Sequence, residues 1–560
     1  MRPPDETSRR PRRRALKAAA LGLTGVTGYD LLQRRHAILR NFPIVGHFRY
    51  LLELFGPELR QYIVTRNDEE RPFNRDQRRW IYASAKAQTN TFGFGTDNEM
   101  EAVSAMLAIE HAPFPAPPPA DGAPGGFPDY AIPAGKVLGA ARGRAHAFRP
   151  RSLVNVSGMS FGALSGPAVQ ALNAGCREAG CMQSTGEGGL APHHCHGGEL
   201  IFQVGTGYFG CRDSAGRFSL AALQETIAGH PVRAIEIKLS QGAKPGLGGL
   251  LPAAKVTPEI ARIRGVEPGR DCVSPPGHSA FGSVDELLDV VESIAQATGL
   301  PVGIKSAVGE QAFWDELAET MARDRGRGID FVVVDGGEGG TGAAPLTFTD
   351  HVALPFKLGF ARVYSAFARA GIAEDVVFVG SGKLGFPDAA LFALALGCDM
   401  VNVGREAMMS IGCIQAQRCH TGRCPTGVAT QNAWLSGGLD PQLKAVRHAT
   451  YLRALRGELL ALARTCGVVH PALVDPGRLA VVGERFTSAP LHEVFGYEPG
   501  WAVPPPARRA EIEALMSCGG TWRPPGPELG PLPGDGTGGD GDGRVPAAPS
   551  RQPRVPPVVG

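Results

Sequence analysis

The sequence predicts an α/β fold, a closed (β/α)8 TIM barrel. Two observations predict it: eight short apolar runs end in glycine-containing loops, and helical patterns separate the consecutive runs. Strands that alternate with helices form a parallel sheet, because parallel neighbours need crossover connections. Eight units favour a closed barrel, although counting alone leaves an open doubly wound sheet as the alternative. The eight runs are Leu153–Val156, Cys181–Ser184, Leu200–Val204, Ala234–Leu239, Val302–Ser306, Ile329–Val334, Val376–Val379 and Met400–Val403.

A helical accessory region is predicted before the barrel, over residues 29–110. Apolar residues recur there at helical spacing in Tyr29–Ile38, Val45–Leu54 and Arg75–Ala87, and Pro72 precedes the last pattern. These segments are expected to form amphipathic helices.

Three further boundaries follow from composition. Residues 111–136 are rich in Pro, Ala and Gly and are expected to form a linker, because such a stretch cannot build a packed element. Residues 501–560 are dominated by Pro, Gly and Asp, which predicts a disordered tail. The barrel itself is expected over residues 137–500.

Charge and cysteine content exclude some classes of function. A net charge of +3 with 20% charged residues gives no reason to expect a nucleic-acid partner. The 11 cysteines are too few for a disulfide scaffold in 560 residues, and three are closely spaced, which favours a reducing compartment. The 75 glycines fall mostly in short motifs and indicate loops where the backbone approaches a ligand.

Residues 1–28 combine a basic start with a short apolar run. Six arginines lie within Met1–Arg14, Lys17 follows, and the apolar run Ala18–Gly28 comes next. That run is shorter than the roughly 20 residues that span a bilayer. The segment imitates an export signal but has no convincing cleavage site, so a cytoplasmic location is expected, with a membrane-surface anchor as the alternative.

Glycines at the ends of the seventh and eighth strands predict a phosphate site. The two segments read VFVGSGKLG and MVNVGREAMM. In such barrels these loops frequently bind phosphate through backbone N–H groups and a helix N-terminus. The candidate phosphate ligands are Ser381, Gly382, Gly404 and Arg405, and ordinary tight turns are the alternative.

The loop after the sixth strand, DGGEGGTGAAP, has almost no side chains around Glu338. A flat ring or a substrate could therefore lie against its backbone, whereas a flexible surface loop is the other interpretation. The residues expected to contact a cofactor there are Gly339, Gly340, Thr341 and Gly342.

The fourth strand and its loop, IEIKLSQGAKPGLGG, place Lys238, Gln241 and Lys244 beside a glycine-rich turn. Two lysines near a barrel mouth suit an anion, such as a reduced flavin, a phosphate or a carboxylate substrate. Lysines are usually solvated surface charges, but Lys238 alternates with apolar residues within the strand, which favours an inward position.

After the last strand, Cys413, Cys419 and Cys424 follow a C-x5-C-x4-C spacing, and a proline comes directly after the third. Thiolates are the usual ligands of iron–sulfur clusters, and the Cys-Pro ending is typical of ferredoxin-like cluster loops. Three thiolates predict a [3Fe-4S] cluster, with a Cys3His zinc site through His420 as the rival.

Together these motifs resemble the FMN-binding synthase domain of glutamate synthase, and more closely its stand-alone relatives. The resemblance covers roughly residues 29–431. Its motifs are SGMSFGALS (Ser157–Ser165), STGEGG (Ser184–Gly189), FQVGTGYFG (Phe202–Gly210), KLSQGAKPGLGG (Lys238–Gly249), SPPGH (Ser274–His278), GGTGAAP (Gly339–Pro345) and CPTGVATQ (Cys424–Gln431).

The resemblance implies FMN over the barrel mouth, with a [3Fe-4S] cluster close by. It implies a reaction in which 2-iminoglutarate, formed from 2-oxoglutarate and ammonia, receives hydride from reduced FMN. Lys238, Glu187 and Gln241 are the implied catalytic residues. The flavin contacts that it implies are Ser157, Gly158, Met159, Ser160, Gln203 and Lys238.

The chain departs from the family where the strand-four loop reads Gly248-Gly249-Leu250 and the family has GGQ. An apolar side chain then replaces a polar contact to the substrate, a loss of roughly 1.5–3 kcal/mol for a hydrogen bond to a charged ligand. Lys244 and Arg264 remain as carboxylate partners. A different anionic substrate for the same cofactors is therefore an alternative function, and an electron-transfer module of a membrane complex is another.

The chain begins MRPPDETSRR, without the N-terminal cysteine of the glutaminase domain of full-length glutamate synthase. The expected substrates are therefore a 2-oxo acid with ammonia or an amine, which a separate amidotransferase subunit could supply. No dinucleotide-binding fingerprint is evident, so an electron-donor protein is expected, either a ferredoxin or a pyridine-nucleotide-dependent subunit.

Overall fold

Eight parallel strands close into a barrel in the computed structural model, which describes residues 9–62, 69–96, 106–117, 132–483 and 487–517. Each strand pairs in parallel with its neighbours, and β11 returns to β2 to complete the cylinder. The strands in barrel order are β2 (Val154–Val156), β3 (Met182–Ser184), β4 (Glu199–Val204), β5 (Val232–Lys238), β8 (Val302–Ser306), β9 (Phe331–Asp335), β10 (Val377–Ser381) and β11 (Met400–Val403).

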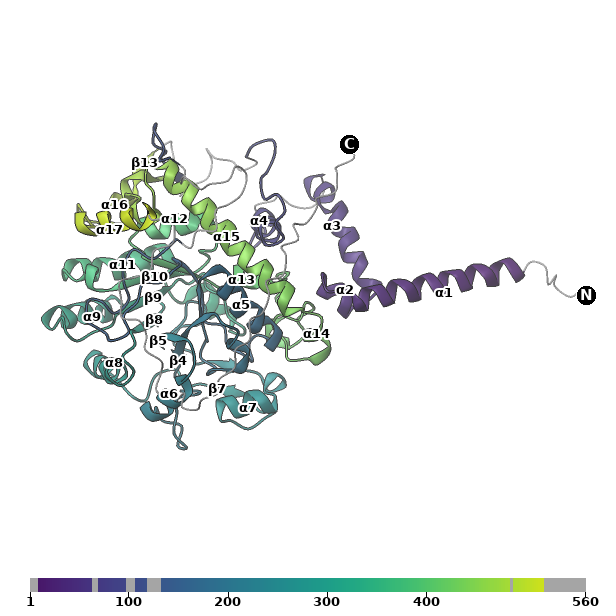
Figure 1. The fold of residues 1–560 in the computed structure, drawn as a ribbon, viewed down its shortest axis with the longest axis horizontal. Coiled ribbons are helices and arrows are strands. Elements are labelled where there is room, and N and C mark those ends of the chain that lie inside the picture. Colours follow the sequence, from purple (N-terminus) through teal and green to yellow (C-terminus); the bar gives the residue numbers. More distant parts are fainter. Residues whose placement is uncertain (1–8, 63–68, 97–105, 118–131, 484–486, 518–560) are drawn as a thin grey trace, which may run out of the picture. The chain divides into compact units, whose positions relative to one another are not determined.

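The predicted fold class is confirmed, and each of the eight predicted runs overlaps one barrel strand. The strands are nearly continuous runs of buried residues because helices cover their outer faces (Figure 1). The helices that follow the strands are α5 (Gly166–Ala179), α6 (Leu220–Ile227), α8 (Val284–Thr298), α9 (Gln311–Arg323), α10 (Leu346–His351), α11 (Phe356–Arg369), α12 (Pro387–Ala395), α13 (Arg405–Ser410), α14 (Ala433–Gly437) and α15 (Pro441–Thr465).

Local sequence signals fix the ends of these helices. The Ser165 hydroxyl accepts a hydrogen bond from the Ala168 N–H at the start of α5, and Gly180 ends the helix in the left-handed conformation. The 25-residue helix α15 begins where the Asp440 carboxylate caps two backbone N–H groups, and it packs along α5. Arg456 of α15 is 1% exposed and donates to the Ala179 carbonyl at 2.7 Å, which ties the two helices together.

The segment between β5 and β8 contains an excursion beside the barrel. A short antiparallel pair, β6 (Leu250–Leu251) and β7 (Cys272–Val273), encloses α7 (Pro258–Arg264). Gly248 lies where the two arms cross, because an added Cβ would be 1.7 Å from the Ser274 carbonyl oxygen. Only glycine fits at that crossing.

The N-terminal region contains the helices α1 (Arg9–Leu32), α2 (Ala37–Asn41), α3 (Val45–Tyr62) and α4 (Arg75–Ala85). The single helix expected over Tyr29–Ile38 is wrong, because residues 33–36 separate α1 from α2. The Gln33 side chain bonds to backbone atoms of Asp30 and His36 across that break. The other two expected helices correspond to α3 and α4.

A small sheet was missed by sequence reasoning. The strand β1 (Met106–Ile109), within the predicted helical accessory region, pairs antiparallel with β12 (Leu479–Val482), and β12 pairs with β13 (Ser488–Pro490). α16 (Leu491–Val494) follows β13. The β1 strand has four residues, too short for a period-two pattern to be distinguished, and its partners lie far along the chain.

Parts of the predicted linker and tail are ordered. Ala112 and Ala116 donate backbone hydrogen bonds to Thr465 and Arg464, while residues 118–131 lie outside the described residues. Within the predicted disordered tail, α17 (Pro506–Ser517) buries Ile512 and Leu515. Its helical apolar spacing, hidden by the Pro- and Gly-rich surroundings, explains the difference. Residues 518–560 lie outside the described residues.

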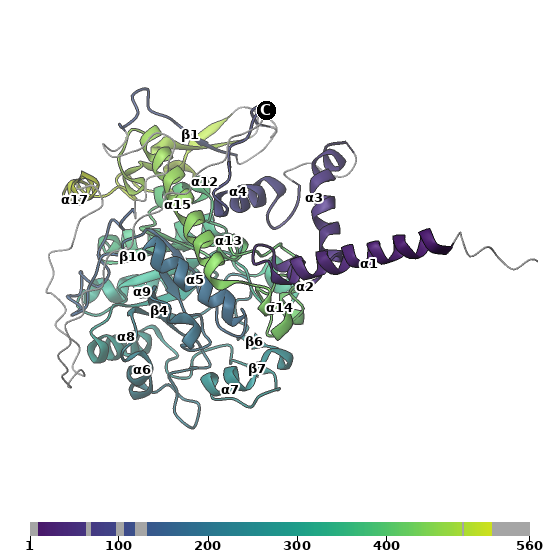
Figure 2. The same cartoon turned by 45° about the vertical axis from the view of Figure 1, so that its right-hand side comes forward.

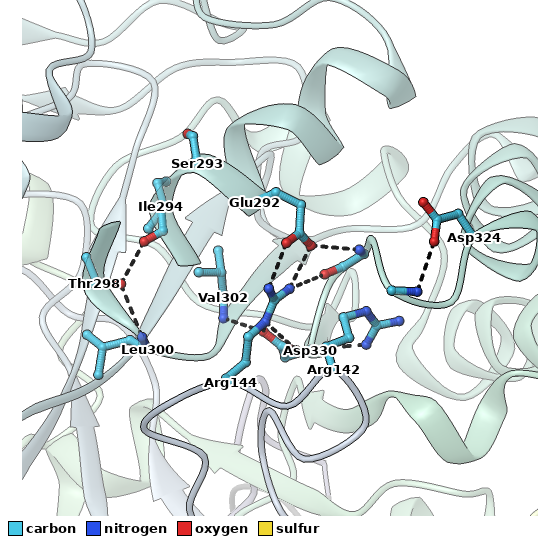
Figure 3. A network of polar contacts seen from close by, with 12 residues as sticks. Arg142, Arg144, Glu292, Ser293, Ile294, Thr298, Leu300, Val302, Asp324 and Asp330 are labelled. Carbon is cyan, nitrogen blue, oxygen red and sulfur yellow. Dashed lines mark hydrogen bonds and ion pairs between the residues drawn. The ribbon is translucent and has the colours of Figure 1, made fainter. Parts of the chain in front are cut away.

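An ion-pair network closes the base of the barrel, where the N-terminal ends of β8 and β9 lie (Figure 3). Arg144 contacts both carboxylate oxygens of Glu292 at 2.7 Å and an oxygen of Asp330 at 2.9 Å. The same Asp330 oxygen accepts a hydrogen bond from the Val302 N–H at 2.8 Å. Asp330 is 2% exposed, so its hydrogen bonds are made within the protein and not to water. The network thereby fixes the buried starts of β8 and β9.

None of the helices in the described part of the chain is long and apolar enough to cross a membrane.

Candidate functional site: the barrel mouth and the cysteine loop

The mouth of the barrel, formed by the C-terminal ends of its strands, contains an ion pair between two predicted catalytic residues. Lys238 is the last residue of β5, and its Nζ lies 2.9 Å from Glu187 Oε1 in the loop after β3. The same ammonium donates to Gln241 Oε1 at 2.6 Å. Burial alone would raise the pKa of Glu187, but the Lys238 ammonium holds that pKa below its usual range. All three predicted catalytic residues therefore meet at one point.

The Lys238 main chain is held by a histidine that sequence reasoning missed. His278 contacts the Lys238 carbonyl through Nε2 at 2.9 Å and the Tyr208 hydroxyl through Nδ1 at 3.1 Å. Burial lowers the pKa of His278, which favours a neutral ring that donates one hydrogen bond and accepts the other. His278 belongs to the SPPGH motif, so its presence in the sequence was noted but not its role.

A second buried charge pair lies beside the first, because Lys305 is in register with Lys238 on the adjacent strand, and sequence reasoning missed it as well. Lys305 of β8 lies 3.6 Å from Asp335, the last residue of β9, and 3.5 Å from the Ser157 hydroxyl. Although burial lowers the pKa of Lys305, the Asp335 and Glu236 carboxylates raise it above its usual value. The pair therefore stays charged. A lysine within an apolar strand, as in GIKS, was the signal that could have found it.

The loop Ser157–Ser160 follows β2 and packs closely against β4. An added Cβ at Gly158 would lie 2.7 Å from Gln203 Nε2. Gln203 in turn donates to Glu236 inside the barrel. An added Cβ at Gly186 would lie 2.5 Å from the Ser160 nitrogen. The predicted flavin contacts Ser157, Gly158, Met159, Ser160 and Gln203 are thus brought together beside Lys238.

The predicted phosphate ligands gather at the ends of β10 and β11. Ser381 is the last residue of β10, and its carbonyl accepts a hydrogen bond from the Gly336 N–H at 2.9 Å. Gly382 has φ of +128°, which a residue with a Cβ rarely adopts. Gly404 precedes α13, and an added Cβ there would meet only the Ser157 Cβ, at 3.7 Å. The backbone at Gly404 is therefore open on the side that faces Ser157.

Arg405 connects that end of the site to the glycine-rich loop after β9. Its guanidinium donates to the Glu338 carbonyl, and an added Cβ at Gly340 would lie 2.7 Å from Arg405 Cδ. The predicted contacts Gly339, Gly340, Thr341 and Gly342 therefore lie beside Arg405. An added Cβ at Gly342 would meet nothing within 4 Å, so the loop faces open space there.

Phe73, from the N-terminal region, supports two cations at the same end. The Arg405 guanidinium and the Lys383 ammonium each lie 5.1 Å from the centre of its ring. Burial, and then the Arg405 charge, lower the pKa of Lys383. Neither Phe73 nor Lys383 was predicted, and the contact joins segments more than 300 residues apart, for which the sequence carries no local signal.

The two predicted substrate ligands are both buried, with Lys244 at 6% and Arg264 at 5% exposure. Lys244 Nζ donates to the Ala343 carbonyl at 3.1 Å, and burial lowers its pKa while Glu187 raises it. Arg264 is 5% exposed and donates to Ser160 Oγ at 3.2 Å and to the Phe161 carbonyl at 3.1 Å. Arg264 therefore braces the loop after β2. Leu250, where the family has a polar residue, is 46% exposed.

Cys413, Cys419 and Cys424 line one small cavity, together with apolar residues that include Met408 and Val428. Burial, with smaller contributions from the neighbouring Cys424 and Cys419, raises the pKa of Cys413 to about 12. In the described part of the chain, no group of three His, Cys, Asp or Glu side chains is placed so that it could hold a metal ion. His420, the rival zinc ligand, is exposed and is absent from the lining of this cavity.

A buried lysine links the cysteine loop to the barrel mouth. Lys255 is 2% exposed, and its Nζ donates to the Cys419 carbonyl at 3.0 Å and to the Ala163 carbonyl at 2.9 Å. Ala163 belongs to the motif that begins at Ser157. Burial lowers the pKa of Lys255, while Cys419 and Cys424 raise it. Sequence reasoning missed Lys255 because nothing in PAAKV distinguishes a buried lysine from a surface one.

The N-terminal region also contacts the cysteine loop. The Tyr82 hydroxyl donates to the Cys413 carbonyl at 2.7 Å, and Gln415 Nε2 donates to the Phe73 carbonyl at 3.1 Å. The Asn41 amide donates to the Pro425 carbonyl at 3.1 Å, directly after Cys424. The accessory region therefore holds both ends of the loop.

The fold and the site define a β/α-barrel protein whose mouth gathers lysines, a carboxylate and bare glycine backbone next to a three-cysteine cavity. The family model described as the conserved region in glutamate synthase matches residues 143–469. The chain therefore belongs to the glutamate synthase family, as the sequence motifs indicated.

The relatives differ in how much of their length is matched. The glutamate synthase large subunit-like protein YerD of Bacillus subtilis (strain 168) is 36% identical over 476 residues, which are 79% of this chain and 89% of that protein. The archaeal glutamate synthase [NADPH] of Methanocaldococcus jannaschii is 36% identical over 321 residues, 56% of this chain and 59% of that protein. The match to the glutamate synthase [NADPH] large chain of Bacillus subtilis covers 17% of that protein at 32% identity.

A solved structure of a flavocytochrome b2 variant with benzoylformate aligns with 72% of this chain and 78% of that chain. The sequence identity is 13% and the TM-score 0.40, which is too distant to assign a ligand.

Proposed function

We propose that the chain is a glutamate-synthase-like oxidoreductase that reductively aminates a 2-oxo acid, with 2-oxoglutarate and ammonia as the first candidates. FMN would lie at the barrel mouth, and Cys413, Cys419 and Cys424 would hold a [3Fe-4S] cluster that admits electrons. The observation that carries the proposal is the juxtaposition of a cationic mouth and a three-thiol cavity, joined through the two hydrogen bonds of Lys255.

The residues at the mouth fit a flat, polar, phosphate-bearing group. Gly382, Gly404 and the loop Gly339–Gly342 expose backbone at one end, where Arg405 supplies a cation. In the described residues, both side-chain amide atoms of Gln183 are buried without a hydrogen-bond partner. Such unmade bonds in a buried amide favour a polar ligand in the barrel interior.

Bound FMN would supply hydride transfer, and the protein groups would orient the reactants. Ionised Glu187 and Gln241 hold the Lys238 ammonium, and His278 fixes the Lys238 main chain. The ammonium is thereby positioned to bind an anion at the mouth, either the substrate carboxylate or the electron-rich edge of the ring. The low pKa of Glu187 makes it a poor proton donor near neutral pH, which favours an orienting role.

The cysteine loop supplies the thiol donors that an iron–sulfur cluster uses, although the described side chains are not placed so that they could hold a metal ion, and cluster binding would have to draw the three thiols together. Three thiols line a cavity whose other lining residues are mostly apolar, and the charge of Lys255 lies beside two of them. A buried cation would offset the negative charge of thiolates bound to iron. An electron-donor protein, such as a ferredoxin or a pyridine-nucleotide-dependent subunit, would reduce the cluster, and a separate amidotransferase subunit could supply ammonia.

Spectroscopy and a product assay test this proposal. The chain, purified without oxygen, is expected to contain FMN, iron and acid-labile sulfide, and 2-oxoglutarate with ammonia should reoxidise the reduced protein and yield glutamate. Cys419→Ser should lose iron and keep FMN. Cys466→Ser is the matched control, because this buried cysteine caps α15 outside the cavity. A colourless protein after reconstitution with FMN, iron and sulfide would contradict the proposal.

A second candidate keeps the cofactors and changes the substrate. Leu250 stands where the family has a polar residue, which favours a different anionic substrate. Comparing 2-oxoglutarate with other 2-oxo acids as oxidants of the reduced protein separates the two candidates. Faster reoxidation by another acid would favour the second.

A further inference from the structure

The N-terminal helices expose an unusual amount of apolar surface. Of the 25 large apolar side chains that are exposed in the described chain, 14 lie between Leu21 and Phe55. Soluble proteins rarely leave many large apolar side chains of one region exposed without a partner.

On α3 these side chains form one stripe. Val45, Phe48, Leu52 and Phe55 are 74%, 62%, 49% and 55% exposed. Their spacing of three or four residues places them on one side of the helix. On α1, Leu21, Tyr29 and Leu32 are 79%, 65% and 83% exposed. These seven side chains are called the apolar face of the N-terminal helices below.

Positive charge is concentrated in the same stretch of the sequence. Residues 1–62 contain 12 Lys and Arg against 5 Asp and Glu, although the whole chain has a net charge of only +3. Six of these basic residues precede Ala18 within residues 9–17, where no acidic residue occurs. Apolar side chains beside a dense cluster of arginines are typical of helices that lie in the headgroup region of an anionic bilayer.

The apolar face has a fixed base. Asp30, which is 0% exposed, accepts hydrogen bonds from the Ile44 N–H at 2.9 Å and from His47 Nε2 at 2.8 Å, which fixes the end of α1 to the start of α3. The Asn41 amide donates to the Pro425 and Leu435 carbonyls, which attaches α2 to the barrel domain. α1 and α3 lead away from α2 in different directions in both views (Figures 1 and 2).

We infer that the apolar face of the N-terminal helices binds the surface of a lipid bilayer that contains anionic phospholipid. The apolar side chains enter the boundary between headgroups and acyl chains, and the arginines at the start of α1 bind lipid phosphates. This binding is independent of the chemistry at the barrel mouth.

Vesicle co-sedimentation of the full chain tests the inference. The protein should sediment with vesicles of phosphatidylcholine and phosphatidylglycerol, and much less with phosphatidylcholine alone. High salt should weaken the binding, because it screens the attraction between arginine and phosphate. Replacing the arginines in Arg12→Gln/Arg13→Gln/Arg14→Gln should reduce both the binding and its salt dependence.

A matched pair of double variants separates the apolar face from general hydrophobicity. Phe48→Glu/Phe55→Glu should lower the binding to anionic vesicles about tenfold or more. Leu346→Glu/Val494→Glu, which changes two exposed side chains on α10 and α16, should leave it unchanged. Circular dichroism of each variant checks that the fold is intact.

Two outcomes would overturn the inference. One is equal loss of vesicle binding in both double variants, or no binding to anionic vesicles at all. The other is a dimer in light scattering that Phe48→Glu/Phe55→Glu converts to a monomer while vesicles have no effect, since the face would then bind a second copy of the chain.

Discussion

The two ends of the barrel contain similar buried ion pairs with different surroundings. At the base, Arg144 is bonded to Glu292 and Asp330, and Asp330 also accepts the Val302 N–H. At the mouth, Lys238 pairs with Glu187, and their side chains are 11% and 19% exposed, against 8% and 0% for Arg144 and Asp330. The charges at the base therefore fix strand ends, whereas the Lys238 cation at the mouth lies within reach of a ligand. Ion pairing by itself does not distinguish structural from functional charges, but the access of a ligand to the pair does.

The largest effect is expected from breaking the base. Asp330→Ala leaves Arg144 and the Val302 N–H without their shared carboxylate, and removing one partner of a buried ion pair costs about 3–5 kcal/mol. The midpoint of thermal unfolding should fall sharply. Asp285→Ala, which breaks a surface pair with Arg327, should cost less than about 1 kcal/mol. An equal fall in the unfolding midpoint of the two variants would show that burial of the Asp330 network does not contribute to stability.

The second effect concerns function at the mouth. Lys238→Ala removes the cation positioned by Glu187 and Gln241, and the loss of one charge-stabilising group typically lowers a rate on the order of 100-fold. Stopped-flow reduction of the bound flavin and steady-state turnover measure this change. The exposed Lys357 serves as control through Lys357→Ala. A normal rate in Lys238→Ala would place that lysine outside the site.

A pair of buried lysines at the two ends gives a sharper comparison. Lys255 donates to two carbonyls at the cysteine loop, and Lys136 donates to the Ala373 and Val376 carbonyls beside the start of β10. Each Lys→Met change leaves two carbonyls without their donor, at about 1–3 kcal/mol for each unsatisfied group. Lys255→Met should lose iron on gel filtration and alter the electron paramagnetic resonance signal, whereas Lys136→Met should lower stability and keep iron. Retained iron and an unchanged signal in Lys255→Met would show that Lys255 does not support the cysteine loop.

The smallest effect tests burial in the helical layer, away from both ends. Burial lowers the pKa of His448 to about 3. At pH values below about 6.5, this histidine binds a proton in the unfolded chain but not in the folded chain. The free energy of unfolding therefore falls with decreasing pH, by up to about 1.4 kcal/mol per pH unit. Unfolding midpoints at pH 7 and 5 should differ less in His448→Gln than in the wild type. An identical difference would show that His448 is accessible to protons. His420→Gln, at an exposed site, should change nothing.

The fold could be predicted because its signal is local and repeated. Each barrel strand is a short apolar run before a glycine-containing loop, and helical patterns intervene, so the eight strands of the barrel follow from the sequence itself. The strand β1 and the helix α17 were missed because one is a four-residue strand with distant partners and the other is embedded in Pro- and Gly-rich sequence.

The candidate site was predictable only where chemistry is concentrated in motifs. Lys238, Glu187 and the three cysteines belong to recognisable segments, and the structure brings each set together. Lys305 carried the same alternation signal as Lys238 and could have been found. The contacts of Phe73 and Tyr82 with distant loops could not have been predicted, because they join chain segments that meet only after folding.

One hydrogen-bonded residue, Asn41, connects the N-terminal helices to the cysteine loop. The Asn41 side chain donates a hydrogen bond to the carbonyl of Pro425, the residue that directly follows the third cysteine. The indole N–H of Trp434 donates to the Asn41 carbonyl at 3.1 Å. The end of α2 is therefore tethered on one side to the thiol loop and on the other to α14, so that a displacement of α2 would strain both contacts.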